Sequence, residues 1–376
     1  MRNPERKLNY TNHLIMLNLH KGNFDKARKL EHSIQAKPDL KSKQLYILGD
    51  FQPSENSYSS NYLRILSDSR VSDLSSYLIS GLPKAEEWVS TRFPGFQSGL
   101  TYFFMNGTGP SPFNAQLGDV YLKVGHYNPV SNDRELVQHA IIHELTHIYL
   151  RNQIGFRIRQ SEFGIRKFFD EGLAQYCGFQ SVGAYKRKLA HADACSAAII
   201  KRDLDGLLHR LKNWMETLFN ERHYPLYQAS MSFIGYLESE LGYDGLINLF
   251  KNTGHGDDFP SLIQEKTGAS IQNHLSNWSN QLPDLNEITT SDFCVITSAK
   301  RISATELKLY YESKYPLYPL NDILVLDSSG TQYETRIKRS KRYEKSGDVL
   351  VICKPGIDLF ATVVHDHNVQ QAEIRN

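Results

Sequence analysis

The stretch Val137–Tyr149, VQHAIIHELTHIY, carries two histidines four residues apart, His143 and His147, with Glu144 directly after the first. In a helix of 3.6 residues per turn, side chains four positions apart project from the same side. Both imidazoles can therefore reach one ion, and the carboxylate of Glu144 can reach a water held by that ion. Neutral nitrogen ligands, an open position and an adjacent carboxylate are what zinc chemistry needs. The H-E-x-x-H pattern thus predicts a zinc site, provided that the stretch is a helix.

The flanking sequence favours such a helix. Asn132 and Glu135 have the spacing of a capping pair, and neither Pro nor Gly interrupts residues 133–153. Apolar residues form a surface that would bury the helix: Leu136, Val137, Ala140, Ile141, Leu145 and Ile148. Two histidines and a glutamate in a buried helix need partners, because unpaired burial is costly. The alternative is an ordinary helix with incidental polar residues.

A third protein ligand has to come from elsewhere in the chain. The metzincin pattern needs Gly and His three and six residues after the second histidine, but Leu150 and Gln153 stand there. The other common solution is a glutamate on a following helix. Glu171, 24 residues after His147, lies in FFDEGLAQY, within an expected helix from Arg166 to Cys177 that Gly178 would end. An ordinary surface glutamate is the alternative reading of Glu171.

HELTH followed by FDEGLAQY resembles the gluzincin metallopeptidases, in particular the aminopeptidase N type and the broader peptidase MA-like group. The resemblance implies an α+β catalytic domain, with a small mixed sheet and a helical subdomain, that hydrolyses peptide bonds. It implies His143, His147 and Glu171 as ligands of Zn²⁺ and Glu144 as the base. It also implies that an edge strand, here Val120–Val124, pairs with an extended substrate.

A downstream helix adds one more candidate. The segment PLYQASMSFIGYL, residues 225–237, is similar to a gluzincin helix whose first Tyr donates its hydroxyl to the oxyanion of the tetrahedral intermediate. Tyr227 holds the matching place. A neutral donor aimed at developing charge is a common way to stabilise a transition state. Tyr224 and His223 are rivals for this role, and simple packing is a further explanation of Tyr227.

The chain also departs from these families. The Gly-Ala-Met-Glu-Asn segment that holds a substrate's free amine in the aminopeptidases has no counterpart, because residues 112–116, PFNAQ, lack a carboxylate. Thermolysin has an Asp four residues after its ligand Glu, where this chain has Gln175. Aminopeptidase specificity is therefore in doubt, and endo- and exopeptidase modes both stay open.

Bulk properties exclude several other classes. Formal net charge is +2 over 376 residues, which gives no case for nucleic acid or an anionic membrane. No apolar run is long enough to span a bilayer. The four cysteines lack a C-x-x-C pair, which argues against a disulfide framework or a cysteine metal site. A cytoplasmic protein is expected, or a secreted or periplasmic one if a signal peptide has been removed.

The pattern along the chain predicts three parts: a helical N-terminal segment at 1–60, a gluzincin-like metallopeptidase domain at 61–283 and a β-rich module at 284–376. Pro53–Ser60 is expected as a linker and Asn61–Phe93 as helical, with Pro83 in a first turn. Strands are expected at Leu100–Met105 and Val120–Val124. Further helices are expected at Leu204–Asn220, Leu226–Leu241, Gly245–Asn252, Phe259–Thr267 and Ile271–Asn280. Short β-rich runs after Pro283 predict a small β-sandwich.

The prediction is zinc-dependent hydrolysis of peptide or protein substrates, with Glu144 and Tyr227 as catalytic residues. Two other functions stay open. One is a non-catalytic scaffold in which a zinc-stiffened domain binds peptides, although such a site usually loses its base or a ligand. The other is a zinc hydrolase acting on a different bond. Sequence alone does not predict the oligomeric state.

Overall fold

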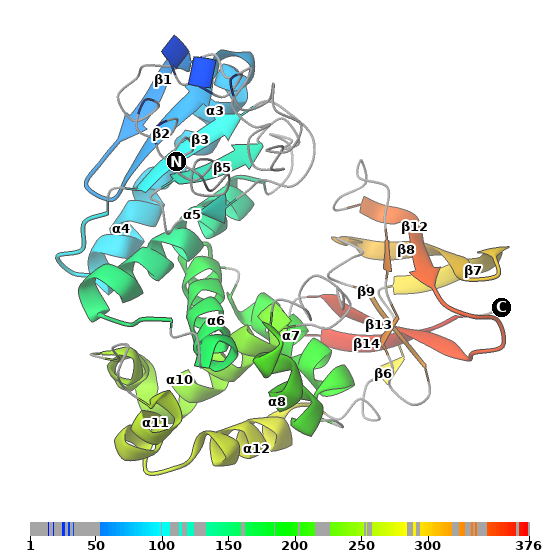
Figure 1. Cartoon of the computed structure of the whole chain (residues 1–376). Helices are drawn as coiled ribbons and strands as arrows, with labels where there is room; N and C mark the ends of the chain where they lie inside the picture. Colours follow the sequence, from blue (N-terminus) through cyan, green and yellow to red (C-terminus); the bar gives the residue numbers. More distant parts are fainter. Residues whose placement is uncertain are drawn as a thin grey trace. The chain divides into compact units, whose positions relative to one another are not determined.

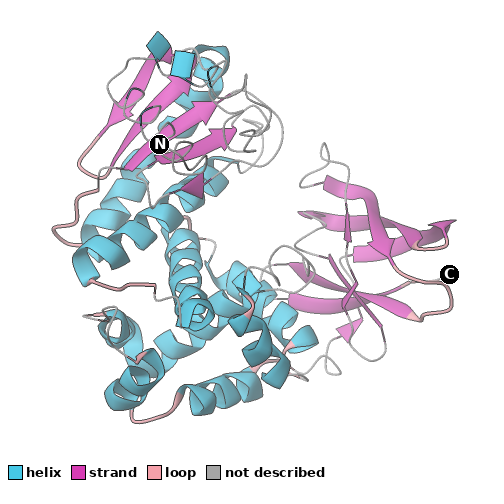
Figure 2. Cartoon of the chain, viewed as in Figure 1, coloured by secondary structure: helices cyan, strands magenta, loops and turns pink. Residues whose placement is uncertain are grey.

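A computed structural model gives the structure of the chain, and its order of elements is drawn in Figures 1 and 2. It describes residues 53–98, 100–105, 113–114, 119–123, 133–158, 162–183, 185–201, 204–214, 226–251, 253, 258–283, 289–290, 294–317, 323–327, 332–333, 335–336, 344–365 and 368–374, and seven single positions before residue 34. Most of the N-terminal segment that was predicted to be helical lies outside these residues. The chain divides into two compact units, Met1–Tyr149 and Leu150–Asn376, while the predicted three-part division stays a prediction.

The first unit contains a five-stranded mixed sheet in the order β1-β2-β3-β5-β4 (Figure 1). Its strands are β1 (Pro53–Ser59), β2 (Leu63–Asp68), β3 (Leu100–Met105), β4 (Phe113–Asn114) and β5 (Asp119–Lys123). Strands β2, β3 and β5 run parallel to one another, and the outer strands β1 and β4 are antiparallel to their neighbours. The small mixed sheet of an α+β domain is therefore present.

Three expectations about this unit were wrong. The predicted linker Pro53–Ser60 is strand β1, and part of the predicted helical region is strand β2. The last four residues of β2 are all buried, and so short a continuous run cannot be distinguished from a buried helical segment by its period. The strand that was expected at an edge, β5, lies between β3 and β4, because the two-residue strand β4 pairs with its first residues.

The helices of this unit follow the predicted pattern more closely. A short 3₁₀ turn, η3 (Ser69–Val71), leads into α3 (Ser72–Ile79), and α4 (Leu82–Arg92) begins with Pro83 in its first turn as expected. The motif helix is α5 (Asp133–Tyr149), and it continues directly into one π-helical turn, Leu150–Ile154. The prediction of an uninterrupted helix over residues 133–153 is confirmed, with a changed hydrogen-bond pattern in its last turn.

The second unit begins with a group of helices: α6 (Phe163–Ser181), α7 (Tyr185–Ile199), α8 (Leu204–Lys212), α10 (Leu226–Phe250), α11 (Phe259–Thr267) and α12 (Ile271–Gln281). Helix α10 packs against α6 and α7, and the core between the helices is aromatic. Phe233 contacts the rings of Phe168, Phe169 and Trp278. This packing fixes α6, which carries Glu171, within its own unit.

Glycines explain where these helices end. Gly268 ends α11 at φ 77°, as predicted, and Gly242 breaks α10 at φ 68°, so the two helices expected there are present on either side of a kink. Gly178 does not end α6, because it is buried within the helix and the chain turns later, at Gly183 with φ 70°. Helix α7 was not predicted from the sequence.

Two sheets follow the helices (Figure 2). One contains β10 (Gln332–Tyr333), β9 (Ile323–Asp327), β13 (Leu359–His365), β14 (Asn368–Glu373) and β6 (Thr289–Thr290), and the other contains β11 (Thr335–Arg336), β12 (Glu344–Ile352), β8 (Glu306–Leu317) and β7 (Cys294–Ser303). Apolar residues from both sheets, such as Leu309 and Val363, share one buried core. The β-sandwich-like module is therefore present, with β6 and β14 as strands that the sequence reading missed.

Two further findings concern membrane spans and cysteines. None of the helices in the described part is long and apolar enough to cross a bilayer. All four cysteines, Cys177, Cys195, Cys294 and Cys353, are buried as free thiols.

Candidate metal site

The two motif histidines meet on the same side of α5. Their Nε2 atoms lie 3.1 Å apart and their ring planes are nearly perpendicular, at 85°. His147 is 6% exposed and His143 is half-buried. The one-turn spacing of the sequence is the cause, because residues at i and i+4 of a helix project in the same direction.

Among the described residues, these histidines form a group with Glu171 that could hold a metal ion. A ring nitrogen of His143, one of His147 and a carboxylate oxygen of Glu171 all lie within 4.8 Å of one another. The structure therefore brings together the three side chains that the sequence reading selected as ligands. Two imidazoles and one carboxylate are a donor set that suits zinc and other first-row transition metals.

Glu144, the predicted base, is buried beside the histidine pair on α5, with 8% of its surface exposed. Thr146, the other polar residue within the motif, is fully buried and donates its hydroxyl to the carbonyl of Ile142 at 2.8 Å. Within the motif, residues 143–147, Glu144 is therefore the buried carboxylate that can take part in proton transfer.

Tyr102 on β3 contacts the motif helix α5, and the sequence reading missed this contact. Its buried hydroxyl lies 3.2 Å from the carbonyl oxygens of both Ala140 and Ile141. Burial and the nearby charge of Glu144 raise the pKa of Tyr102 well above its ordinary value, so the group stays a neutral donor. Tyr102 therefore fixes the turn of α5 that precedes His143 against the sheet.

Glu171 lies on α6, where its neighbours are charged. Lys167, one turn earlier, places Nζ 2.5 Å from Glu171 Oε1 and 3.1 Å from Asp170 Oδ2. Burial opposes the charged form of Lys167, but the carboxylates of Asp170 and Glu171 outweigh that effect and hold its pKa above the ordinary value. The i, i+4 spacing was visible in the sequence, but the burial that makes this ion pair strong was not.

Gly172, directly after Glu171, lets α6 and α10 approach closely. A Cβ atom at this position would lie 2.5 Å from the carbonyl oxygen of Ser230 and 2.6 Å from Cγ1 of Ile234. The Gly of the E-G pair is therefore required by the packing of α6 on α10, next to the ligand candidate.

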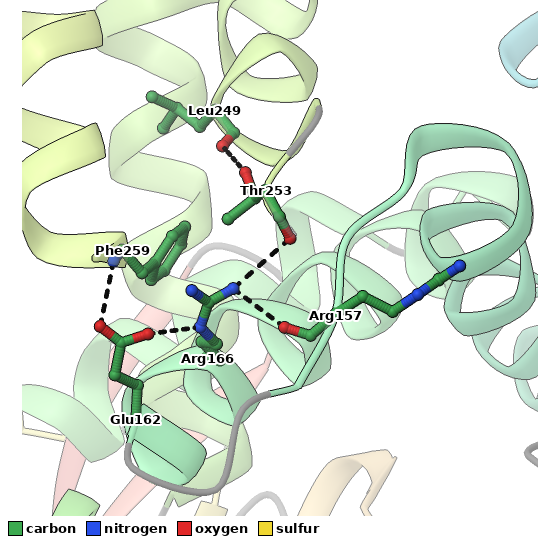
Figure 3. Close-up of polar contacts among 6 residues, drawn as sticks. All are labelled: Arg157, Glu162, Arg166, Leu249, Thr253 and Phe259. Carbon is green, nitrogen blue, oxygen red and sulfur yellow. Dashed lines mark hydrogen bonds and ion pairs between the residues drawn. The ribbon is translucent and has the colours of Figure 1, made fainter. Parts of the chain in front are cut away.

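The start of α6 is held by a buried guanidinium (Figure 3). Arg166 is fully buried, pairs with Glu162 at 2.6 Å, and donates to the carbonyl of Arg157 at 2.9 Å. The second carboxylate oxygen of Glu162 accepts the backbone N–H of Phe259 at the start of α11. This network ties α6 to α11 and to the segment after the π-helical turn, and nothing in the sequence pattern had indicated it.

Tyr227, the predicted oxyanion donor, lies in the first turn of α10 and is half-buried. Its ring contacts Trp214 edge to face, with centroids 6.1 Å apart. The catalytic role of Tyr227 stays a prediction. Its rivals, His223 and Tyr224, lie outside the described residues.

Comparisons with known proteins add little to this geometry. No known family and no curated protein matches the chain. Among solved structures, it is similar to the crystal structure of Legionella pneumophila aminopeptidase A in complex with aspartic acid, at 12% identity and a TM-score of 0.39. The match covers 83% of this chain and 37% of the other, so the chain spans little more than a third of that protein. Values this low do not establish a shared fold.

Proposed function

We propose that this protein is a zinc-dependent peptidase, with His143, His147 and Glu171 as metal ligands and Glu144 as the general base. The observation that carries the proposal is the group of three ligating atoms within 4.8 Å, with a buried carboxylate directly after the first histidine. A cytoplasmic location also remains a prediction.

The donor set fits zinc. Two nitrogens bonded to a tetrahedral zinc at ~2.0–2.1 Å would lie about 3.3 Å apart. The Nε2 atoms of His143 and His147 are separated by 3.1 Å, close to that value. A metal with three protein ligands retains an open position, which is the arrangement of catalytic rather than structural zinc sites.

The residues of the chain have separate roles in the proposed reaction. Zn²⁺, when bound, would lower the pKa of a water and polarise the scissile carbonyl. A carboxylate oxygen of Glu144 accepts the proton of the attacking water and later returns it to the nitrogen of the leaving amine. The Tyr227 hydroxyl donates a hydrogen bond to the oxygen that becomes negative.

Zinc content of purified protein tests the site without relying on turnover. We expect one zinc per chain in the wild type and in Glu144→Gln, because that residue is not a ligand. His147→Ala and Glu171→Gln should lose most of their zinc, because each removes one of three donors. Equal zinc content in all four proteins would contradict the ligand assignment, and a wild type that binds none would contradict the whole proposal.

A further inference from the structure

Tyr102 reaches the motif helix α5 from the middle of the sheet. Its strand, β3, lies between β2 and β5 (Figure 1), and the residues in register with it on those strands are Ile65 and Val120. The Tyr102 side chain is fully buried, at 0% exposure. Because strands on both sides hold β3, the hydroxyl of Tyr102 has a well-defined position in the sheet.

This hydroxyl contacts the turn of α5 that carries Glu144. Its oxygen lies 3.2 Å from the carbonyl oxygens of both Ala140 and Ile141. In an α-helix each N–H donates to the carbonyl four residues earlier, so the same two carbonyls accept the N–H groups of Glu144 and Leu145. A carbonyl oxygen has two lone pairs and can accept both bonds. One atom, the carbonyl oxygen of Ala140, therefore joins the hydroxyl of Tyr102 to the backbone of the proposed base.

The histidine ligands of α5 are held differently. By the same helical rule, the N–H of His143 donates to the carbonyl of His139, and the N–H of His147 donates to the carbonyl of His143. Within the described part of the chain, the hydroxyl of Tyr102 donates to neither of these two carbonyls. Its contacts therefore act on the backbone of the base more directly than on the backbone of the ligands.

We propose that Tyr102 is a positioning residue that holds Glu144 at the distance from the attacking water that proton transfer requires. The inference rests on the proposed function, because it takes Glu144 as the general base. Proton transfer needs a distance of ~2.6–3.2 Å between donor and acceptor, so a small displacement of this turn lowers the rate. The ligands keep their own helical bonds, so zinc binding should change little.

Two tyrosine variants test this role. Tyr102→Phe removes the hydroxyl and keeps the ring. Tyr58→Phe is the matched control, because the hydroxyl of Tyr58 on β1 donates to Glu86 on α4 at 2.6 Å and so also joins a strand to a helix in the same unit. The measurements are zinc content, steady-state kinetics on a cleaved peptide, and amide hydrogen exchange of the metal-free protein.

We expect Tyr102→Phe to retain one zinc per chain and to lower kcat roughly tenfold with little change in KM. The amides of Glu144 and Leu145 should exchange about fivefold faster relative to the other amides of α5, because their acceptor carbonyls lose a hydrogen bond to the sheet. This relative rate separates a local effect from a general loss of stability. Tyr58→Phe should leave zinc content, kcat and the relative exchange rate unchanged.

A wild-type kcat in Tyr102→Phe would overturn the positioning of Glu144, and loss of zinc would overturn it by placing the effect at the ligands. An unchanged relative exchange rate at Glu144 and Leu145 would overturn it as well. Exchange requires neither metal nor turnover, so it separates this inference from the proposed function. If the wild type cleaves no peptide, the proposed function fails, while faster relative exchange at the two amides would still support Tyr102 as the residue that holds this turn.

Discussion

Single side chains decide what the candidate site can do, and Tyr227 is the one whose role depends on a single atom. Its ring packs against Trp214, so removing only the hydroxyl should leave that contact in place. Tyr227→Phe is expected to lower kcat by about 10²–10³ with a smaller change in KM, as the loss of an oxyanion donor does. Steady-state kinetics on a cleaved peptide measures both.

The control for this prediction is Tyr310→Phe, a half-buried tyrosine on β8. It should keep the wild-type kcat. If Tyr227→Phe also keeps it, the hydroxyl of Tyr227 is not the oxyanion donor and the residue is packing alone.

Sequence reading at this scale succeeded where local spacing determines geometry. His143 and His147 were predictable because a helix brings residues four apart to one side. Tyr102 was not predictable, because its contact with the carbonyls of Ala140 and Ile141 joins residues almost 40 positions apart. Lys167 lay within reach of the i, i+4 rule, but its importance depends on burial that only the packing of α6 reveals.

Contacts between helices position Glu171, and the close approach of α6 to α10 at Gly172 lies directly beside it. Gly172→Ala puts a Cβ within 2.5 Å of the Ser230 carbonyl, so α6 and α10 must move apart. We expect a loss of about 1–3 kcal/mol in the free energy of unfolding, together with weaker zinc binding, because Glu171 is adjacent. Urea denaturation and zinc titration measure the two effects.

A free energy of unfolding equal to that of the wild type would show that the two helices are less tightly constrained than the contact with Ser230 implies. Weaker zinc binding without any change in stability would still place the effect at Glu171.

The half-buried carboxyl of Asp193 on α7 is linked through Ser232 on α10 to Trp278 on α12. Ser232 donates to Asp193 at 2.5 Å and accepts from the indole of Trp278 at 2.8 Å. Burial raises the pKa of Asp193 from 3.8 to about 6, and the hydrogen bond from Ser232 opposes that shift. A raised pKa means that the folded state binds the proton more tightly than the unfolded state, so this group stabilises the fold most below pH 4.

That contribution is lost as the pH rises from about 4 to about 6. Asp193→Asn cannot ionise and keeps an oxygen for Ser232, so it should be more stable than the wild type above pH 6 by about 2 kcal/mol. The difference should shrink toward pH 4. Unfolding measured at pH 4.5, 6 and 8 would contradict this if the difference did not depend on pH.

Helices were predicted well where a glycine ends or interrupts them. Gly268 ends α11 and Gly242 breaks α10, because both adopt positive φ. The six residues of β2 were misread because a run this short fits both the 3.6-residue period of a helix and the two-residue period of a strand. Gly178 was misread because a glycine can also serve close packing inside a helix, as Gly172 does.

Metal binding should affect the stability of the protein, because His143 and His147 lie on α5 and Glu171 lies on α6. A ligand that binds only the folded state adds about 4 kcal/mol at a thousandfold excess over its Kd. We therefore expect a chelator to lower the Tm and zinc to restore it. Glu171→Gln should show a much smaller response, and an equal response in that variant would place the bound zinc elsewhere.

Prediction was weakest for the molecule as a whole. The mixed sheet, the helical group and the β-rich module were expected, but the strand order β1-β2-β3-β5-β4 and the packing of α10 on α6 and α7 were not. Both depend on contacts between distant segments that no local pattern records. The function of the β-rich module was likewise not predictable from its strands.

The most direct test of the central claim is peptide-library profiling by mass spectrometry, comparing zinc-loaded wild type with Glu144→Gln. We expect the wild type to cleave peptides and Glu144→Gln to keep its zinc and cleave none. The positions of the cuts would distinguish endo- from exopeptidase action. Equal cleavage by both proteins would contradict the role of Glu144, and silence from both with one zinc bound per chain would contradict a general peptidase.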